Sequence, residues 1–492
     1  MISFAEVKQL AEQYSVIPVV QRLFSGTETP VGMYSKLCGN RPNTFLLESA
    51  EQGVWGRYSF IGVTSRGILT ADTEASWISE SPALPSGELS AEPAQALRQM
   101  QDAWKQAPTD FPLSSGLVGY LSWGAVNLVE RLPAPGGEDY RLPLYRFTQF
   151  DSLVVMDHQS AELLLVSVIF VDGSDLEKQY QTAVESIAKL RKQIAQPTPA
   201  TISEPHWPEP AFEQRTKRAD FLDQVDRAKE YVRKGDVFQV VISQRFDQEI
   251  TADALDVYRA LRALNPSPYM YLTRFEDEQG EFSIVGSSPE ALVKVSGRHV
   301  VTHPIAGSRP RGGDSTADMA LADELSADAK EKSEHLMLVD LARNDLLRVC
   351  NPQTLQVSEF MQIHRFSHIM HLVSTVEGEL RDDMSAVDAV LATFPAGTLS
   401  GAPKPRAMEI IHELEPSYRG LFGGVIGYFD FEGNSDLAIA IRTALIRDGV
   451  AHVQAGAGIV LDSVPESEYA ETEAKAAVVL RAVAAANAMK NA

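Results

Sequence analysis

The stretch Phe282-Ser-Ile-Val-Gly-Ser-Ser-Pro289 is a strand-like run that closes on polar residues and a proline, and it has a counterpart in Tyr58-Ser-Phe-Ile-Gly-Val-Thr-Ser65. A second pair of segments, Gly116-Leu-Val-Gly-Tyr120 and Gly424-Val-Ile-Gly-Tyr428, follows in the same order. Either an internal duplication or chance similarity between short strands explains both pairs. Such runs are bounded by glycine or polar turns, and longer helices are interspersed without strict strand-helix alternation. We therefore predict an α+β protein with large antiparallel sheets.

A proline-rich connector divides the chain. Residues Gln196 to Pro210 hold five prolines and little periodic apolar character, which indicates an extended segment. We predict an N-terminal part, residues 1–205, and a C-terminal part, residues 213–492. The place four residues after the glycine of each repeated segment is Arg66 in the first part and Glu290 in the second. Because only the second part keeps a carboxylate there, we expect the chemistry to lie in the C-terminal part.

The segment after the connector shows the local signals of a helix and a strand. Phe221 begins a run of apolar residues at helical spacing, with Asp220 as its predicted N-cap and Gly235 as its stop. A strand from Val237 through Arg245 is expected next.

Composition limits the possible function classes. The 492 residues carry a formal net charge of -22, which disfavours a role on nucleic acid or on an anionic membrane surface. Only Cys38 and Cys350 occur, so a disulfide framework is not expected. Charged residues interrupt the N-terminus, and no apolar run is long enough to cross a membrane. We expect a cytoplasmic enzyme that acts on a small molecule.

Two predicted helices each carry a pair of glutamates on one face. The pairs are Glu331 and Glu334 in Ser326 to Arg348, and Glu468 and Glu471 in Pro465 to Arg481. Carboxylates three residues apart share a helix face, and buried carboxylates need a cation, hydrogen bonds or a raised pKa. The four side chains form either an oxygen-rich site for Mg²⁺ or two solvated acidic faces.

Other segments provide groups that bind anions. Arg442 stands in an apolar, strand-like run, so it needs a carboxylate partner, from either a substrate or a structural salt bridge. Glycine-rich turns let backbone N–H groups approach an anion, although each is more often only a turn. They occupy residues 304–312, 395–403 and 454–458. His371 lies in Phe366-Ser-His-Ile-Met-His-Leu-Val-Ser374, where a lone histidine is usually a hydrogen-bonded core residue.

Together these segments resemble the chorismate-utilising enzymes, and among them the anthranilate synthase large subunits, across nearly the whole chain. The matching segments are GRYSFIG at Gly56 to Gly62, DVFQVVISQRF at Asp236 to Phe246, GSSPE at Gly286 to Glu290, PIAGSRPRG at Pro304 to Gly312, KEKSEHLMLVDLARNDL at Lys330 to Leu346, PAGTLSGAPK at Pro395 to Lys404, and EYAETEAKA at Glu468 to Ala476. The resemblance implies an α/β/β/α sandwich with two sheets packed face to face and a cleft for chorismate and Mg²⁺ in the C-terminal part.

The resemblance also implies an activity and a role for each residue. The expected reaction converts chorismate and ammonia to anthranilate and pyruvate in tryptophan biosynthesis, with ammonia supplied from glutamine by a separate amidotransferase subunit in a hetero-oligomer. The expected Mg²⁺ ligands are Glu334 and Glu471, with Glu331 and Glu468 nearby. The expected substrate-binding residues are Ser308, Arg442, Gly456, Gly458 and Lys475. The expected catalytic residues are Glu290 as the acid, His371 as the base or orienting group, and Thr398 beside them.

Two positions separate this chain from sister enzymes. Ala306 stands where the aminodeoxychorismate synthases have a nucleophilic lysine, and Gln239 stands where isochorismate and salicylate synthases have a lysine base. Phe422, Ser308 and Val464 depart from a usual tyrosine, threonine and aspartate. The alternatives are an enzyme on the same scaffold that makes aminodeoxychorismate or aminodeoxyisochorismate, or a non-catalytic tryptophan-sensing protein.

The N-terminal part resembles a regulatory pocket. Leu46-Leu-Glu-Ser49 and Asn265-Pro-Ser-Pro-Tyr-Met270 are similar to the segments through which tryptophan inhibits the family. The expected tryptophan-binding residues are Glu48, Ser49, Pro268 and Met270. Without the resemblance, a strand edge and a proline-containing turn would be the preferred interpretation.

Overall fold

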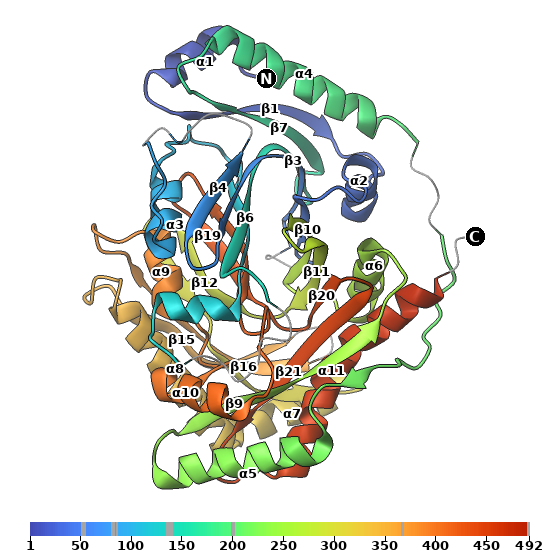
Figure 1. The fold of residues 1–492 in the computed structure, drawn as a ribbon, viewed down its shortest axis with the longest axis vertical. Helices are drawn as coiled ribbons and strands as arrows, with labels where there is room; N and C mark the ends of the chain where they lie inside the picture. The colour runs from blue at the N-terminus through green and yellow to red at the C-terminus, as the bar shows by residue number, and fades with distance from the viewer. Residues whose placement is uncertain are drawn as a thin grey trace.

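A computed structural model describes residues 1–50, 56–79, 84, 87–133, 141–197, 202–365 and 369–489. The strands occupy the middle of the molecule and the helices lie on the outside (Figure 1). Every pairing between the named strands is antiparallel. The predicted α+β class with large antiparallel sheets is therefore confirmed.

The elements before the connector are α1 (Phe4–Ala11), β1 (Val16–Phe24), α2 (Pro30–Leu37), β2 (Thr44–Glu48), β3 (Tyr58–Ala71), β4 (Ala75–Ser79), α3 (Pro93–Asp102), β5 (Gly116–Leu121), η1 (Trp123–Leu128), β6 (Tyr145–Asp157), β7 (Glu162–Phe170) and α4 (Leu176–Ile194). Those after it, as far as Ala327, are β8 (Glu213–Gln214), α5 (Arg218–Lys234), β9 (Gln239–Glu249), α6 (Ala254–Leu264), β10 (Tyr269–Asp277), β11 (Gly280–Ser288), β12 (Ala291–Ser296), β13 (His299–Thr302), β14 (Ile305–Pro310) and α7 (Ser315–Ala327). The remainder are α8 (Ala329–Leu347), β15 (Gln356–Arg365), β16 (Ile369–Glu379), α9 (Ala386–Thr393), β17 (Gly401–Ala402), α10 (Lys404–Leu414), β18 (Val425–Asp430), β19 (Ser435–Ile439), β20 (Thr443–Arg447), β21 (Val450–Ile459) and α11 (Pro465–Ala488).

The strands form two sheets that share a corner. The first sheet runs β9-β21-β20-β11-β10-β2-β3-β6-β7-β1, and the second runs β4-β3-β6-β5-β18-β19-β12-β13-β16 with β14 and β15 beside β16. The long strands β3 and β6 belong to both sheets, because their pairing register shifts between Gly62 and Gly67. Bulges of this kind let a strand bend out of one sheet and into another. The strand pairing is thus continuous through the described strands, and the first and second sheets are joined through β3 and β6.

Both parts of the chain contribute to the same hydrophobic cores. The larger core contains Phe147 from β6 and Phe429 from β18, whose ring centroids lie 5.5 Å apart. A second core fills the space between the outer face of the first sheet and helices α1, α2, α4, α6 and α11. The predicted parts 1–205 and 213–492 are therefore packed as one body, and the boundary between them stays a prediction. Part of the connector, residues 198–201, lies outside the described residues.

The repeated segments occupy matching places in the sheets. The Tyr58 and Phe282 segments form β3 and β11, which flank the central pair β2 and β10 in the first sheet. The Gly116 and Gly424 segments form β5 and β18, which pair with each other in the second sheet, with Gly119 opposite Gly427. Such symmetry favours an internal duplication over chance similarity.

Several predicted boundaries are corrected by the structure. The helix expected from Ser326 to Arg348 is found as α8, but it begins at Ala329, while Ser326 and Ala327 end α7. Asp328 separates the two helices because it is the N-cap of α8 and accepts hydrogen bonds from the backbone N–H groups of Lys330 and Glu331. Asp220 is wrong as the N-cap of α5, since Lys217 holds that place. Gly235 is confirmed as the stop, with a left-handed φ of 82° that glycine adopts without strain.

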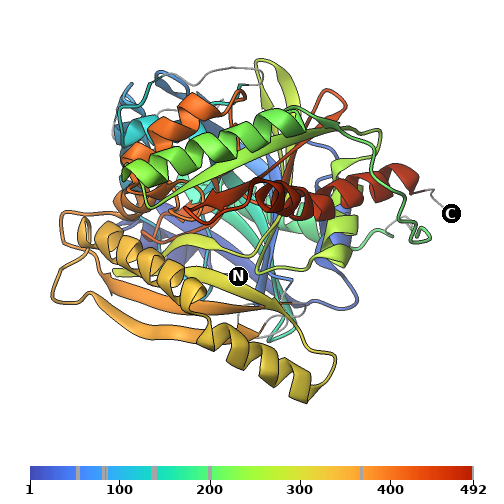
Figure 2. The same ribbon diagram turned by 90° about the horizontal axis from the view of Figure 1, so that it is seen from below.

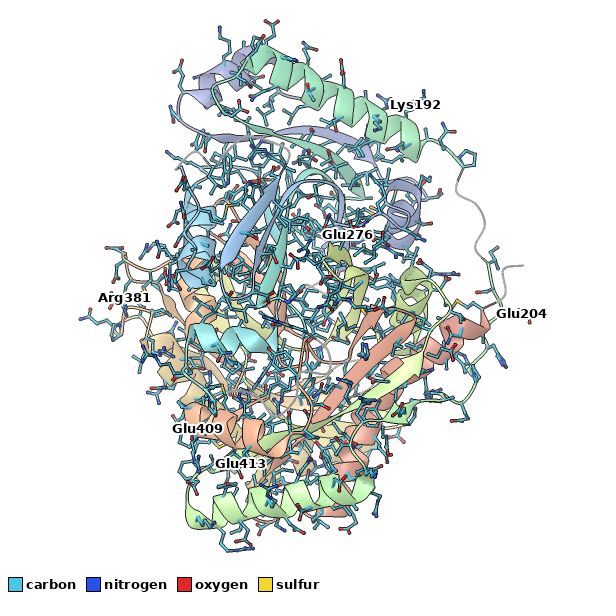
Figure 3. The ribbon with its side chains drawn as sticks, in the orientation of Figure 1. Lys192, Glu204, Glu276, Arg381, Glu409 and Glu413 are labelled. Atoms are coloured by element: carbon cyan, nitrogen blue, oxygen red, sulfur yellow. The ribbon has the colours of Figure 1, made fainter. Side chains whose placement is uncertain are left out.

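The surface and the free thiols agree with the composition. Charged side chains such as Lys192 and Glu413 point outward, while side chains fill the space between the layers (Figure 3). Cys38 and Cys350 are buried free thiols, as the sequence predicted. Within the described ranges, the search for helices of membrane-spanning length and hydropathy finds none.

The Val464→Asp substitution is expected to stabilise the protein. Val464 is the N-cap of α11 and offers no side-chain hydrogen bond to the first turn, whereas an aspartate at this place can accept one. We expect the free energy of unfolding to rise by about 0.5–2 kcal/mol in urea titrations. Val464→Asn supplies the same hydrogen bond without a charge and is the matched control. An unchanged or lowered stability in both variants would contradict the capping role.

Candidate active site

Glu290 and Arg442 lie where the chain passes from one sheet to the other. Glu290 joins β11 of the first sheet to β12 of the second, and Arg442 joins β19 of the second to β20 of the first. Because β11 pairs with β20 and β12 pairs with β19, the two crossings are neighbours. The N–H of Ile439 donates to the carbonyl of Glu290, and the N–H of Ser287 donates to the carbonyl of Arg442. The sheet corner therefore brings the predicted acid beside the predicted carboxylate-binding arginine.

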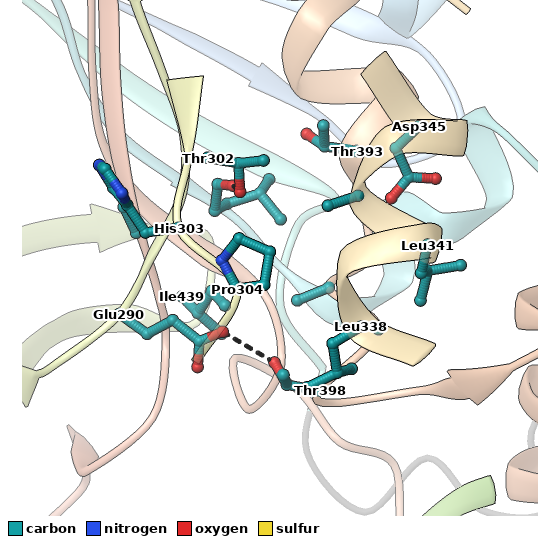
Figure 4. A pocket seen from close by; sticks show the side chains of 15 residues that line it. Glu290, Thr302, His303, Pro304, Leu338, Leu341, Asp345, Thr393, Thr398 and Ile439 are labelled. Carbon is teal, nitrogen blue, oxygen red and sulfur yellow. Dashed lines mark hydrogen bonds between the residues drawn. The ribbon is translucent and has the colours of Figure 1, made fainter. Parts of the chain in front are cut away.

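Thr398 is the direct partner of the Glu290 carboxylate. Its hydroxyl donates to Glu290 Oε1 over 3.1 Å, from the loop between α9 and α10 (Figure 4). Burial raises the pKa of Glu290 to about 7, while the Thr398 hydrogen bond and the charges of Arg442 and Lys475 act in the opposite direction. A carboxyl group with this pKa is half protonated near neutral pH, so it can donate a proton in the way a general acid must.

Arg442 is a half-buried cation without a fixed partner among the described residues. Its backbone has a left-handed φ of 51°, and burial lowers the pKa of its guanidinium. The charges of Glu290 and Glu471 favour its protonated form. No ion pair or side-chain hydrogen bond of Arg442 is found in the described part of the chain. A half-buried guanidinium without a protein partner is suited to bind a substrate carboxylate.

His371 is held by strand β14. Its Nδ1 lies 3.0 Å from the carbonyl oxygen of Gly307, and Ser308 is paired with His371 across β14 and β16. Because a carbonyl only accepts, Nδ1 carries the hydrogen and the lone pair lies on Nε2. Burial and the Arg442 charge lower the pKa of His371, so the ring is neutral at neutral pH. The segment that contains His371 is described only from Ile369 onward.

The acidic pairs of α8 and α11 are within range of each other's charge. Burial raises the pKa of Glu334, and the charges of Glu331 and Glu471 raise it further. Burial also raises the pKa of Glu468, which is in range of the Glu471 charge. In the described ranges, however, no three carboxylates, histidines or cysteines are close enough to enclose a metal ion. The charges of the predicted carboxylates thus affect one another's pKa, but the carboxylates do not surround a single point at which a metal ion would bind.

Cations and an amide engage three of these carboxylates. Lys475 Nζ lies 2.6 Å from Glu471 Oε1, Arg309 Nη1 lies 3.5 Å from Glu331 Oε1, and Gln239 Nε2 donates to Glu334 Oε1 over 3.3 Å. Lys475 also donates to the carbonyl of Gly456 over 2.9 Å, which links α11 to β21. A Cβ at Gly458 would lie 2.2 Å from Gln239 Nε2, so this glycine is required for the close approach of Gln239.

The structure shows the burial and contacts of the residues at which this chain differs from the family pattern or from sister enzymes. Ser308 is exposed on β14, and its side chain makes no hydrogen bond among the described residues. Phe422 is buried, with the guanidinium of Arg419 over its ring at 5.5 Å. Ala306 is buried in β14.

A pocket extends from Glu290 toward residues that the sequence analysis missed. Its lining includes Glu290, Thr398, Leu338, Leu341 and Asp345, and it encloses about 430 Å³ including its open mouth (Figure 4). Asp345 forms a buried ion pair with Lys404 at 2.6 Å. The signal for Asp345 was present, because the stripe of Glu331, Glu334, Leu338 and Leu341 continues to Asp345 at helical spacing.

The two segments of the predicted tryptophan pocket meet in the structure. Glu48 of β2 is opposite Met270 of β10, and the N–H of Ala50 donates to the carbonyl of Ser267, next to Pro268. The Glu48 carboxylate accepts hydrogen bonds from the hydroxyl of Tyr258 at 2.8 Å and from the guanidinium of Arg262 at 2.6 and 2.9 Å. The Glu48 carboxylate is thus held by side chains of α6. The role of the four residues in tryptophan binding stays a prediction.

Ser49→Ala is expected to weaken inhibition by tryptophan. Ser49 Oγ is buried and has no hydrogen-bond partner among the described residues, which leaves it available to a ligand. Loss of one ligand hydrogen bond is expected to raise the half-inhibitory tryptophan concentration by about 2- to 10-fold, with kcat unchanged. The measurement is initial rate against tryptophan concentration, with Ser59→Ala as the control because Ser59 Oγ is already paired with His158. Equal inhibition of the Ser49 variant and the parent protein would contradict the assignment.

Comparisons with known proteins show the family of the chain. The family model of chorismate binding enzymes matches residues 42–481. The anthranilate synthase component 1 of Arthrobacter globiformis is 48% identical over 99% of this chain and 93% of its own length, and that of Mycolicibacterium smegmatis is 48% identical over 98% and 93%. The crystal structure of anthranilate synthase component I from Streptococcus pneumoniae superposes with a TM-score of 0.76 at 32% identity, covering 94% of this chain and 99% of that one. The isochorismate synthase MenF of Escherichia coli, at 19% identity and a TM-score of 0.69 over 98% of both chains, shares the fold.

The chain belongs to the family of chorismate binding enzymes. Within that family its sequence groups with the component 1 proteins of anthranilate synthase. The resemblance noted in the sequence is thus confirmed over nearly the full length.

Proposed function

We propose that the chain converts chorismate and ammonia to anthranilate and pyruvate. The observation that carries the proposal is the position of the Glu290 carboxyl group beside the half-buried cation Arg442, where burial raises the pKa of Glu290 to about 7. The enzyme must protonate a leaving hydroxyl and bind a dianionic ring, and these two groups supply the two functions.

The first half of the reaction is an amination. Glu290 donates its proton to the C4 hydroxyl oxygen as the C4–O bond breaks, while ammonia forms a bond to C2 and the ring double bonds shift. Water leaves, and the new ammonium group loses a proton. Thr398 keeps the Glu290 carboxyl oriented through its hydrogen bond, and Arg442 holds a substrate carboxylate.

The second half is an elimination that makes the ring aromatic. His371 Nε2 accepts the C2 proton, because the neutral ring keeps its hydrogen on Nδ1 toward Gly307. The C3–O bond then breaks, and the enolpyruvyl group leaves and becomes pyruvate once its methylene carbon is protonated. Loss of pyruvate makes the overall reaction of the lyase type.

We also propose that Mg²⁺ binds between α8 and α11. The donor set fits in its chemistry, since four carboxylates share the space and the charges of Glu331 and Glu471 raise the pKa of Glu334, an interaction that a divalent cation would relieve. The residues that would hold the ion are Glu334 and Glu471, with Glu331 and Glu468 beside them. When bound, Mg²⁺ would neutralise the ring carboxylate of the substrate.

A second protein is proposed to supply the ammonia. The relatives are named component 1, which supports a partner component, and we propose a glutamine amidotransferase in a hetero-oligomer with tryptophan as the inhibitor. A cytoplasmic location is proposed as well, supported by the two buried free cysteines.

Product analysis tests the proposed reaction. The purified chain is incubated with chorismate, MgCl₂ and ammonium chloride at alkaline pH, and products are separated by liquid chromatography. We expect fluorescent anthranilate and an equal amount of pyruvate. A stable non-aromatic amine would instead indicate aminodeoxychorismate or aminodeoxyisochorismate synthesis, and no turnover at all would favour a tryptophan-sensing protein.

A further inference from the structure

The loop that carries Thr398 is closed by a buried lysine. Lys404 Nζ, at the start of α10, donates to the carbonyl of Thr393 at the end of α9 over 2.8 Å. The same ammonium donates to Asp345 Oδ2 on α8 over 2.6 Å. Their side chains are only 11% and 9% exposed. One cation thus joins both ends of the loop and ties them to the helix that carries Glu331 and Glu334.

Packing fixes the loop against the same helix. A Cβ at Gly397 would lie 2.1 Å from Leu341 Cδ2, so the backbone next to Thr398 rests directly on α8. On the other side, Arg419 donates to the carbonyls of Leu399 and Val241 over 2.7 and 2.8 Å. The position of the Thr398 hydroxyl is therefore determined by contacts on both sides of the loop.

The pair and the catalytic carboxyl group share one pocket. Asp345 and Thr393 line the end opposite Glu290 and Thr398, with Leu338 and Leu341 between them (Figure 4). A buried ion pair stabilises a fold little more than well-packed apolar residues do, so stability alone does not account for this one. Its geometry accounts for it better, because a short, charged hydrogen bond to Asp345 and a second bond to the carbonyl of Thr393 fix where the Lys404 ammonium lies.

We propose that Asp345 and Lys404 are positioning residues that hold the Thr398 hydroxyl against the Glu290 carboxylate. This inference rests on the proposed function, in which Glu290 is the acid. The hydrogen bond from Thr398 favours the ionised form of Glu290, so loss of alignment leaves Glu290 more readily protonated and less well oriented.

The test is the pH dependence of kcat/KM for chorismate, measured at constant free ammonia and saturating Mg²⁺. Thr398→Val removes the hydrogen bond directly, and we expect the alkaline limb of the profile to move up by about half a pH unit or more. Lys404→Met is expected to move the limb in the same direction and to lower kcat by about tenfold, with a smaller change in KM. In the Thr398→Val background, Lys404→Met should produce no further shift, because the contact it aligns is already gone.

The matched control is Arg447→Met. Arg447 pairs with Asp277 at 2.5 Å, with side chains 9% and 10% exposed, at the far end of β20. Like Lys404→Met, Arg447→Met leaves a buried carboxylate unpaired, so it shows the general effect of such a change on stability. The alkaline limb of the pH profile should not move in this variant. The Arg447 and Thr398 variants both retain the other titratable groups near Glu290, which are Arg442, Lys475, Asp345 and His303.

Each outcome decides the inference. If Lys404→Met does not move the alkaline limb, the positioning role is overturned. The same holds if its shift adds fully to the Thr398→Val shift in the double variant. If Lys404→Met does not fold, Asp345→Asn, which keeps the side-chain volume, is measured in the same cycle with the same expectations. Failure of the parent protein to form anthranilate would instead refute the proposed function, so the two failures are distinguishable.

Discussion

Glu290→Gln is expected to lower kcat by about 10²- to 10⁴-fold and to abolish the alkaline limb of the pH profile. Proton donation contributes rate factors of this size, and glutamine keeps the shape of the side chain but has no acidic proton. In the parent protein the acid is active when protonated, so kcat/KM should fall as the pH rises through about 7, the pKa of Glu290. The measurement is the steady-state rate of anthranilate formation between pH 6 and 9 at constant free ammonia.

Asp430→Asn provides the control for this experiment. Burial raises the pKa of Asp430 to about 6, and the residue is the last of β18. It lies at the other end of the β18–β19 pair from Ile439, whose N–H donates to Glu290. The substitution changes a buried carboxyl group of similar pKa without touching the proposed acid. Disappearance of the alkaline limb in the Asp430 variant, or its persistence in the Glu290 variant, would assign the limb to another group.

Glu334→Gln is expected to abolish Mg²⁺-dependent turnover while the fold stays intact. Glu334 is half-buried and in range of the charges of two other carboxylates, and an amide in its place removes one negative charge and one strong Mg²⁺ donor. We expect Mg²⁺ affinity to fall by at least about tenfold, from the loss of a charge-assisted contact. Calorimetric titration with MgCl₂, without substrate, measures this directly, and anthranilate formation measures the consequence.

Glu466→Gln is the matched control for the metal experiment. Glu466 lies in the exposed first turn of α11, two residues before Glu468, and it is outside the proposed donor set. Like Glu334→Gln, the Glu466→Gln substitution removes one negative charge, but it should leave the Mg²⁺ affinity within about twofold of the parent value. Parent-like Mg²⁺ binding and activity in Glu334→Gln would remove the basis for a metal site between α8 and α11.

Local sequence patterns predicted many elements but not where they meet. The stripe from Glu331 to Leu341 predicted a helix face correctly, and Gly235 predicted the end of α5, because both signals depend on residues a few positions apart. The break at Asp328 was missed, since an aspartate inside a helical pattern becomes a cap only when the chain turns there. The site residues were identified largely through the family resemblance, as the individual motifs allowed simpler interpretations.

The sequence by itself determined the α+β class and the carboxylate pairs, because short-range patterns carry that information. The family resemblance identified Ala306 and Gln239 as positions where sister enzymes have a lysine. Only the tertiary structure decided that Glu290 and Arg442 lie at adjacent crossings between the sheets and that Thr398 donates a hydrogen bond to Glu290. It also decided that the charges of Glu331 and Glu471 act on Glu334, although no three of the described carboxylates enclose a metal site. These features arise from strand pairing between segments over 100 residues apart, such as β11 with β20, and no local pattern records which strands will pair.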